Sequence, residues 1–234
     1  MHEIHIPMRW ADLDQLNHVN NVVHVDYAME ARTGLVDDGL LEAELPIRRV
    51  RVGFLRPLLL SSKPVLVRSL RDGDVLTQEI RSHDGSALFS TLITEHGRPE
   101  RMDDHRGTPL GMQVRRSDVG PDGAVTITRL FELFQETRIL SFASVIPHRQ
   151  AGRFVVGRVE LDLGDPLPWR RDPYLAQTCI SHVGRSSFSS LTRIEGGRYG
   201  SATATLVGFD LQNQRSRPLD DDEREALTAA LLPV

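Results

Sequence analysis

The stretch MRWADLDQLNHVNNVVHVDYAMEAR, residues 8–32, decides the fold of this chain. Apolar and polar residues alternate over residues 4–10, which overlap the start of this stretch, and this alternation predicts a short strand. An Asp- and Asn-rich turn follows, and beyond the turn apolar residues recur at helical spacing. Asn20 or Asn21 is a good N-cap, because its side-chain oxygen can accept a hydrogen bond from the free N–H groups of the first turn. Most of the helix circumference is apolar or small, which predicts a helix wrapped by protein, with a sheet as the expected wrapper.

The turn places five polar side chains directly before the helix N-terminus: Asp12, Asp14, His18, Asn20 and Asn21. A helix N-terminus carries free N–H groups and a partial positive charge. It can therefore polarise a carbonyl, or hold an oxyanion, while a nearby carboxylate attacks or activates water. The alternative is that these side chains only cap the helix and close the turn. Residue types alone favour this structural interpretation, because a short motif is only a hypothesis.

Residues 10–21, WADLDQLNHVNN, resemble the signature of the 4-hydroxybenzoyl-CoA thioesterase-like branch of the hotdog-fold acyl-CoA thioesterases. That signature runs aromatic-x-Asp-x-Asp-x-x-Gly-His-Val-Asn-Asn and continues into an aromatic-rich helix ending in Glu-x-x-Arg or Glu-x-Arg. Three residues of the following helix also match it: Tyr27, Glu30 and Arg32. Asn17 replaces the usual Gly, which is tolerable because Asn visits the left-handed region more readily than most residues. His24 stands where Tyr or Phe is usual, so the lining of the acyl pocket is expected to differ from the family's at this position.

The resemblance implies hydrolysis of an acyl-CoA, or of an acyl carrier protein thioester, to acid and thiol without a cofactor. The family's catalytic carboxylate maps onto Asp14, which either attacks the carbonyl or deprotonates the attacking water. Backbone N–H groups near Asn21 would polarise the carbonyl, and His18 and Asn20 would hold the turn and help to place water. The candidate catalytic residues are therefore Asp14, His18 and Asn21, and the candidate substrate-binding residues are Asn20 and His24.

Four strand-like runs follow the helix in the first half of the chain: residues 47–54, 65–70, 75–82 and 87–96. The tetrapeptide His83-Asp84-Gly85-Ser86 between the last two runs predicts a hairpin. A strand, a helix and four consecutive strands predict an antiparallel sheet with one helix against it, which is an α+β arrangement. In the resembled family this arrangement is the hotdog, a curved antiparallel sheet wrapped round one long central helix.

The second half of the sequence repeats this order. Placing Arg138 on Arg32 sets an offset of 106 residues and aligns Asp118 with Asp12. A turn is followed by a predicted helix at 126–143 and by four predicted strands at 154–163, 174–182, 186–195 and 201–210. A repeat of this length indicates a domain duplication. We therefore expect a double hotdog with four parts: an N-terminal hotdog module (1–97), a Gly- and Pro-rich linker (98–111), a C-terminal hotdog module (112–218) and a helical tail (219–234).

The two halves differ in their polar residues. Under the same offset the second half has lost four candidate groups: Gly120 stands at Asp14, Ala124 at His18, Thr126 at Asn20 and Ile127 at Asn21. It keeps three others, Asp118, Glu136 and Arg138, so their counterparts Asp12, Glu30 and Arg32 are expected to be structural. We expect one competent motif and one degenerate motif. The tail is expected to be a capped amphipathic helix that docks through Leu227, Leu231 and Leu232.

Composition and residue spacing argue against several classes of partner. The 234 residues carry a formal net charge of −4 with scattered basic residues, which argues against nucleic acid as a partner. No segment looks like a targeting sequence or a membrane span, so we expect a cytoplasmic protein without a membrane partner. Cys179 is the single cysteine and is expected to be a packed side chain rather than a nucleophile. The histidines lack the spacing of a zinc helix, so no metal is expected.

Two alternatives stay open at this point. The first is a non-catalytic module of hotdog fold that binds acyl-CoA or an acyl carrier protein and keeps Asp14 only as a cap. The second is a hotdog dehydratase or hydratase, which is weaker because Asp14 and His18 are only four residues apart in a turn of the thioesterase type. Two pseudo-dimers could also associate further into a homo-oligomer.

Overall fold

The computed structural model describes residues 1–43, 45–99, 107–142 and 153–231. The chain divides into two compact units, Met1–Pro99 and Glu100–Val234. Each unit runs through the same order of elements: a short strand, one turn of 3-10 helix, a long α-helix and then four strands.

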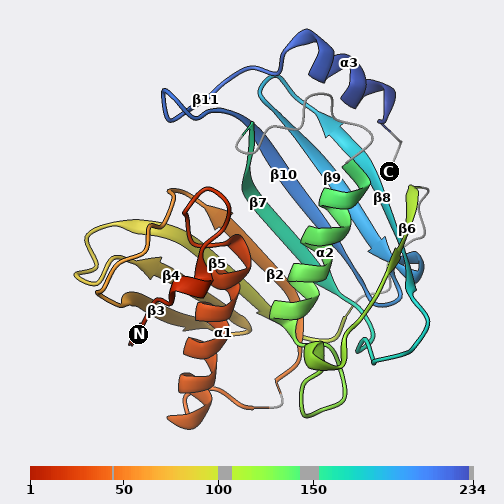
Figure 1. Ribbon diagram of the computed structural model, residues 1–234. Coiled ribbons are helices and arrows are strands. Elements are labelled where there is room, and N and C mark those ends of the chain that lie inside the picture. The colour runs from red at the N-terminus through yellow and green to blue at the C-terminus, as the bar shows by residue number, and fades with distance from the viewer. Residues whose placement is uncertain (44, 100–106, 143–152, 232–234) are drawn as a thin grey trace. The chain divides into compact units, whose positions relative to one another are not determined.

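Unit 1 is one antiparallel sheet with one helix (Figure 1). Its elements are β1 (His2–Ile6), η1 (Trp10–Asp12), α1 (Asn21–Asp37), β2 (Ile47–Phe54), β3 (Val65–Asp72), β4 (Val75–Arg81) and β5 (Leu88–His96). The strands lie in the order β1-β3-β4-β5-β2. The predicted hairpin joins β4 to β5: Ser82 donates its N–H to the Ala87 carbonyl at 2.9 Å, and Gly85 takes a positive φ of 73°.

The core of unit 1 lies between α1 and this sheet. Val25, Ala28 and Ala31 of the helix are completely buried, as the small and apolar circumference predicted. The amide of Gln78, from β4, donates to the Ala28 carbonyl at 2.8 Å and so ties the sheet to the middle of the helix. Gly39, in the predicted exit loop, takes a φ of 69°, which stops the helix after Asp37.

The strands of unit 2 are also antiparallel, and α2 lies across one face of them (Figure 1). Its elements are β6 (Thr108–Met112), η2 (Arg116–Asp118), α2 (Ile127–Phe142), β7 (Phe154–Leu163), β8 (Tyr174–Val183), β9 (Ser187–Ile194), η3 (Glu195–Gly197), β10 (Gly200–Asp210), β11 (Arg215–Ser216) and α3 (Asp221–Ala229). The strands lie in the order β7-β10-β9-β8-β6, and β11 pairs with β10. Phe131 and Phe134 of α2 are buried, and Phe142 meets Phe188 of β9 edge-on with ring centroids 5.7 Å apart.

The C-terminal helix α3 is capped as predicted. Asp220 accepts the N–H of Glu223, and the Glu223 carboxylate in turn accepts the N–H of Asp220. Glu223 is only 1% exposed and also receives hydrogen bonds from Arg153 and Arg217, both at 2.7 Å. Leu227 is completely buried, Leu231 is largely exposed, and Leu232 lies outside the described residues.

Two predicted boundaries differ from the structure. The first strand ends at Ile6 rather than reaching Trp10, because Pro7 has no N–H with which to continue the ladder. Trp10 begins η1 instead and is 81% exposed. The predicted linker 98–111 overlaps β6, which pairs with β8 at an end of the sheet; Pro109 is tolerated there because an edge strand does not need every N–H.

Two further points concern the helices. The predicted end of the second helix, Ala143, lies outside the described residues. Among the helices that are described, none is both long enough and apolar enough to cross a membrane.

Candidate active site

The polar turn of unit 1 is a closed hydrogen-bonded loop. Asp14 donates its N–H to the His18 carbonyl at 2.8 Å, and Asn17 donates its N–H to the Asp14 carbonyl at 3.1 Å. Asn17 has a φ of 58°, so it takes the left-handed conformation for which glycine is usual, and the sequence prediction is confirmed. The turn is fixed to the next loop, because Val19 donates its N–H to the Leu58 carbonyl at 2.8 Å.

The Asp14 carboxylate is half-buried and uses one of its two oxygens inside this turn. Oδ1 accepts the backbone N–H groups of Leu16, at 2.8 Å, and His18, at 3.0 Å. Within the described part of the chain, no donor reaches Oδ2. One oxygen therefore anchors the carboxylate while the other keeps its lone pairs for a ligand or a water molecule.

Asp12 is held by hydrogen bonds from two neighbouring elements. Its Oδ2 accepts the N–H of Arg9 and the hydroxyl of Tyr27, both at 2.7 Å, and its carbonyl accepts the N–H of Asn20 at 2.8 Å. Burial, the hydrogen bond to Asp12 and the nearby carboxylates raise the pKa of Tyr27 well above its usual value. Asp12 thus ties η1 to α1, which agrees with the structural role predicted for it.

The N-terminus of α1 begins immediately after this loop. Asn20 is the N-cap, and its Oδ1 accepts the N–H of Val22 at 3.1 Å, as predicted. Asn21 is the first helical residue, and among the described residues its backbone N–H has no acceptor, as is usual for this position. An unpaired donor at a positive helix end is suited to a carbonyl oxygen or an anion.

The two histidines of the motif occupy different environments. His18 is half-buried, and its ring makes no hydrogen bond to the residues that the structure describes. His24 is only 3% exposed, its Nδ1 lies 2.7 Å from the Ser90 hydroxyl, and its ring meets Phe54 edge-on at 5.4 Å. Desolvation by burial lowers the pKa of His24 to about 4. His24 is therefore a neutral core residue in the free protein, and its contact with substrate stays a prediction.

A pocket of about 290 Å³ lies within unit 1, and none of the candidate residues Asp14, His18, Asn20, Asn21 and His24 lines it. Its apolar walls are Met8, Leu58, Leu59, Pro64, Val65 and Phe89, and its polar walls are Ser61, Lys63, Ser82, His83, Asp84 and Ser86. Leu58 and Leu59 connect pocket and turn, because their backbones pair with Val19 and His18 respectively. The pocket therefore adjoins the turn through this loop.

The equivalent turn of unit 2 keeps the backbone hydrogen bonds but differs in its polar side chains. Gly120 donates to the Ala124 carbonyl at 2.8 Å, and Gly123, with a φ of 84°, donates to the Gly120 carbonyl at 3.1 Å. Asp118 accepts the N–H of Arg115 at 2.7 Å, as Asp12 accepts that of Arg9. At the position of Asp14, however, Gly120 has no side chain, and the carboxylate of Asp122 instead accepts the N–H of Ala124 at 3.1 Å.

Sequence reasoning missed the loop after β2. Leu58, Leu59 and Leu60 form an apolar run in that loop, and Leu59 is 60% exposed. An exposed apolar run outside any strand is a usable signal for a binding surface.

Cys179 is buried, and desolvation raises the pKa of its thiol, as suits a packed side chain. No three His, Cys, Asp or Glu side chains of the described ranges gather as they would to hold a metal ion.

Comparison with known proteins identifies the fold. The chain matches the 12:0-ACP thioesterase from Umbellularia californica with a TM-score of 0.66 and 11% identity over 93% of this chain and 94% of that one. A protein described as a possible oleoyl thioesterase from Lactobacillus plantarum gives a TM-score of 0.66 and 12% identity, with 89% and 96% of the two chains covered. An acyl-ACP thioesterase from Bacteroides thetaiotaomicron gives a TM-score of 0.59 and 10% identity over 88% and 96%. No protein-family profile and no curated protein sequence matches the chain. The chain therefore has the hotdog-type fold of these structures.

Proposed function

We propose that this chain is a double-hotdog thioester hydrolase that converts an acyl-CoA or an acyl carrier protein thioester to the free acid and the thiol. Unit 1 carries the active site, and unit 2 is the degenerate copy. Fold likeness to three thioesterases supports the reaction class. The motif resemblance supports the placement in the 4-hydroxybenzoyl-CoA thioesterase-like branch.

One observation carries the role of Asp14: within the described residues, its Oδ1 is held by the turn while its Oδ2 has no hydrogen-bond partner. Both turns make the same two backbone hydrogen bonds, at 2.8 and 3.1 Å, although Gly120 replaces Asp14. In unit 2 the carboxylate of Asp122 accepts the N–H of Ala124, which is the counterpart of the His18 N–H, so a turn of this kind can be capped from another position. A carboxylate at position 14 is therefore not required for the cap, and its free oxygen is available for chemistry. By contrast, Asp12 has a counterpart in Asp118 with the same backbone contact, as expected of a structural residue.

The proposed reaction places the thioester carbonyl oxygen against the backbone N–H of Asn21. In one route Oδ2 of Asp14 attacks the carbonyl carbon, the thiolate leaves, and water opens the resulting mixed anhydride to release the acid. In the other route Asp14 takes a proton from water while the hydroxide adds to the carbonyl, and the departing thiolate takes up a proton. A thiolate is a good leaving group, so neither route requires a strong general acid. His18 and Asn20 hold the turn and help to place water in both.

The pocket beside the turn suits the part of the substrate next to the thioester. Leu58, Leu59 and Phe89 offer an apolar wall for a pantetheine arm or an acyl chain, while Lys63 and His83 bring basic groups to the same cavity. A pocket with apolar walls and a few polar groups is typical of small-molecule sites.

The test is thiol release by the purified protein across short, long and aromatic acyl-CoAs and acyl carrier proteins, compared with Asp14→Asn. The amide keeps an oxygen for the N–H groups of Leu16 and His18, so the turn survives, while a nucleophile or base is lost. We expect turnover to fall at least about a hundredfold, in line with the removal of an acid–base or nucleophilic group. The matched control is Asp122→Asn, which alters the carboxylate that caps Ala124 in the turn of unit 2 and should leave turnover unchanged.

A second candidate is the non-catalytic acyl-thioester binding module. The observation that favours it is the pair of backbone hydrogen bonds on Oδ1, which is the pattern of a carboxylate that only caps a turn. Calorimetry separates the two functions. Binding of acyl-CoA without turnover, unchanged in Asp14→Asn, supports the binding module and refutes the hydrolase.

A further inference from the structure

Unit 2 contains a pocket of about 210 Å³ beside the last described turn of α2. Its walls come from four elements: α2 (Ser141 and Phe142), β8 (residues 178–180), β6 (Thr108) and the residue after α3 (Ala230). The degenerate turn precedes the opposite end of α2, which begins at Ile127. The pocket is therefore separate from the motif that resembles the thioesterase signature.

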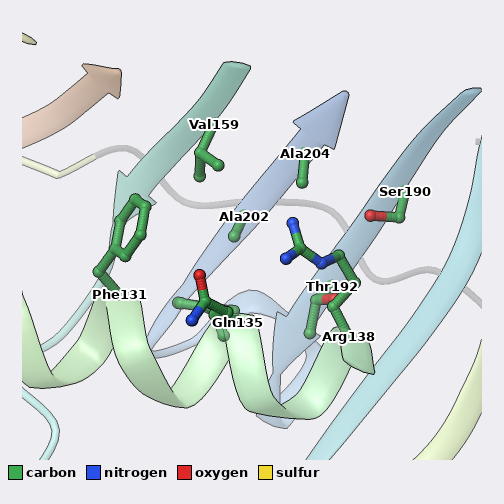
Figure 2. A pocket seen from close by; sticks show the side chains of 9 residues that line it. Phe131, Gln135, Arg138, Val159, Ser190, Thr192, Ala202 and Ala204 are labelled. Carbon is green, nitrogen blue, oxygen red and sulfur yellow. The ribbon is translucent and has the colours of Figure 1, made fainter. Parts of the chain in front are cut away.

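The space beneath the middle of α2 is filled by side chains. Figure 2 shows Phe131, Gln135 and Arg138 of the helix facing the strands of the sheet, and Arg138 is only 6% exposed. The gap that these side chains leave is about 10 Å³, which is room for at most about one water molecule. The far larger space at Ser141 is thus a local feature and not part of a general gap between helix and sheet.

One buried polar group of this pocket lacks a partner. Ser141 is largely buried, and its hydroxyl makes no hydrogen bond to any described residue. One turn earlier, Thr137 donates its hydroxyl to the Leu133 carbonyl at 2.8 Å, which is a usual way for a hydroxyl in a helix to be satisfied. A buried hydroxyl without a partner costs stability, so Ser141 offers a hydrogen bond that a ligand can complete.

The rest of the lining favours a neutral and mainly apolar ligand. Phe142 and Ile180 are buried and apolar, and the Thr178 hydroxyl is already paired with that of Thr192 at 2.9 Å. No charged side chain of the described residues lines the pocket, so a carboxylate or a phosphate would lose its hydration without gaining a counter-charge. Water fills such a space poorly, because an ordered water molecule needs about two to four polar partners.

The volume sets the size of the ligand. A protein cavity of about 150 Å³ accepts benzene, so a pocket of about 210 Å³ has room for one ring with roughly one or two further non-hydrogen atoms. Aromatic rings make favourable edge contacts with one another, as Phe142 already does with Phe188. We propose that unit 2 binds a small neutral phenol, with its ring against Phe142 and Ile180 and its hydroxyl hydrogen-bonded to Ser141. A phenol hydroxyl both donates and accepts, as the serine hydroxyl does, so the two groups can pair in either direction.

The ligand also contacts the C-terminal segment of unit 2. Ala230 follows α3, whose Leu227 is completely buried, and Leu231 forms an isolated β-bridge with Ile180. A bound phenol therefore joins α2 to the end of α3 and stabilises the docking of that helix. All of these residues belong to unit 2, so binding requires none of the residues proposed for hydrolysis.

The experiment measures the binding of phenol, toluene and benzoate to the full chain by calorimetry, with the thermal midpoint of unfolding as a second readout. The signal that tests the proposal is the part that Ala230→Phe removes, because this substitution fills the pocket from the C-terminal segment. Phenol should give such a signal and raise the midpoint, whereas benzoate, an anion of similar size, should give none. A crystal soaked in 4-bromophenol should show an anomalous peak beside Ser141.

Matched variants test which groups hold the ligand. Ala229→Phe, at the exposed neighbouring position, should retain the binding that Ala230→Phe abolishes. Ser141→Ala should lower the ratio of phenol affinity to toluene affinity about fivefold, as for the loss of one hydrogen bond, since toluene has no hydroxyl. If Ala230→Phe fails to fold, this ratio and the soaked crystal still decide.

Two results would contradict the proposal. An equal ratio in the wild type and in Ser141→Ala would refute the contact with Ser141 and with it the class of ligand. No binding that Ala230→Phe removes, together with no bromine peak, would mean that water or the chain itself fills the pocket, and the proposal would be wrong.

Discussion

The buried imidazole of His24 predicts that unit 1 loses stability in mild acid. The ring is almost fully buried, is bonded to the Ser90 hydroxyl, and has a pKa of about 4 rather than the ordinary 6.5. Below pH 6.5 the unfolded chain takes up a proton at this residue, whereas the folded chain resists it until about pH 4. The stability contribution is therefore complete above pH 6.5 and is lost as the pH falls through this window.

The magnitude follows from the two pKa values. With 1.36 kcal/mol for each pKa unit, the free energy of unfolding at about pH 4.5 should lie about 2.5 kcal/mol below its value at neutral pH from this residue alone. His96, whose pKa burial also lowers, acts in the same direction. The total slope of the wild type therefore exceeds the contribution of His24, and only a difference between variants isolates it.

The assay is urea unfolding at neutral pH and at about pH 4.5, for the wild type and for His24→Phe combined with Ser90→Ala. The phenyl ring fills the position beside Phe54, and the second substitution avoids leaving a buried hydroxyl without a partner. The pH-dependent loss should shrink by about 2.5 kcal/mol in the double variant, while His83→Gln, at an exposed histidine, serves as the control for losing an imidazole. Equal pH dependence in the wild type and the double variant would refute the assignment of His24 as a neutral buried residue.

Two other substitutions test local structure. Glu223→Gln removes the buried charge that Arg153 and Arg217 share, so urea unfolding at neutral pH should show a loss of about 3–5 kcal/mol; a loss below about 1 kcal/mol would show that these arginines find other partners. Asn17→Gly should leave stability unchanged or raised, because φ is 58°, whereas Asn17→Val should cost about 1–2 kcal/mol by the same measurement. Equal stability of the two Asn17 variants would contradict the left-handed conformation.

Features set by neighbouring residues could be predicted from the sequence. The Asn20 cap, the hairpin at Gly85 and the capped start of α3 at Asp220 all depend on side chains within five residues of the backbone that they bind. The strand positions were predictable for a related reason, since alternation of apolar and polar residues reports which face of a strand is buried.

Features set by distant residues could not be predicted. His24 meets Ser90 and Arg153 meets Glu223 across 66 and 70 positions, and no periodicity encodes such a pairing. Strand β6 was missed because Pro109 and Gly111 look like loop residues, and only its place at the end of a sheet makes them acceptable. The burial of Arg138 could not be predicted for the same reason, because it depends on strands that are distant in the sequence.

Comparing the two turns distinguishes the features that the fold requires from the side chains that are available for a reaction. Two loops 106 residues apart keep the same backbone hydrogen bonds and the same aspartate at their start, Asp12 and Asp118, so those features are what the fold requires. Asp14 and His18 are present in only one loop. The other loop has Gly120 and Ala124 at these positions, and the carboxylate of Asp122 accepts the N–H of Ala124, so its cap comes from a different position. Both turns are capped by a carboxylate, but the fold does not require that carboxylate at the position of Asp14, where one oxygen also stays free of the turn. Catalysis at Asp14 is therefore inferred from the position of its carboxylate and from its free oxygen, and the inference is wrong if Asp14→Asn unfolds unit 1 while leaving unit 2 folded.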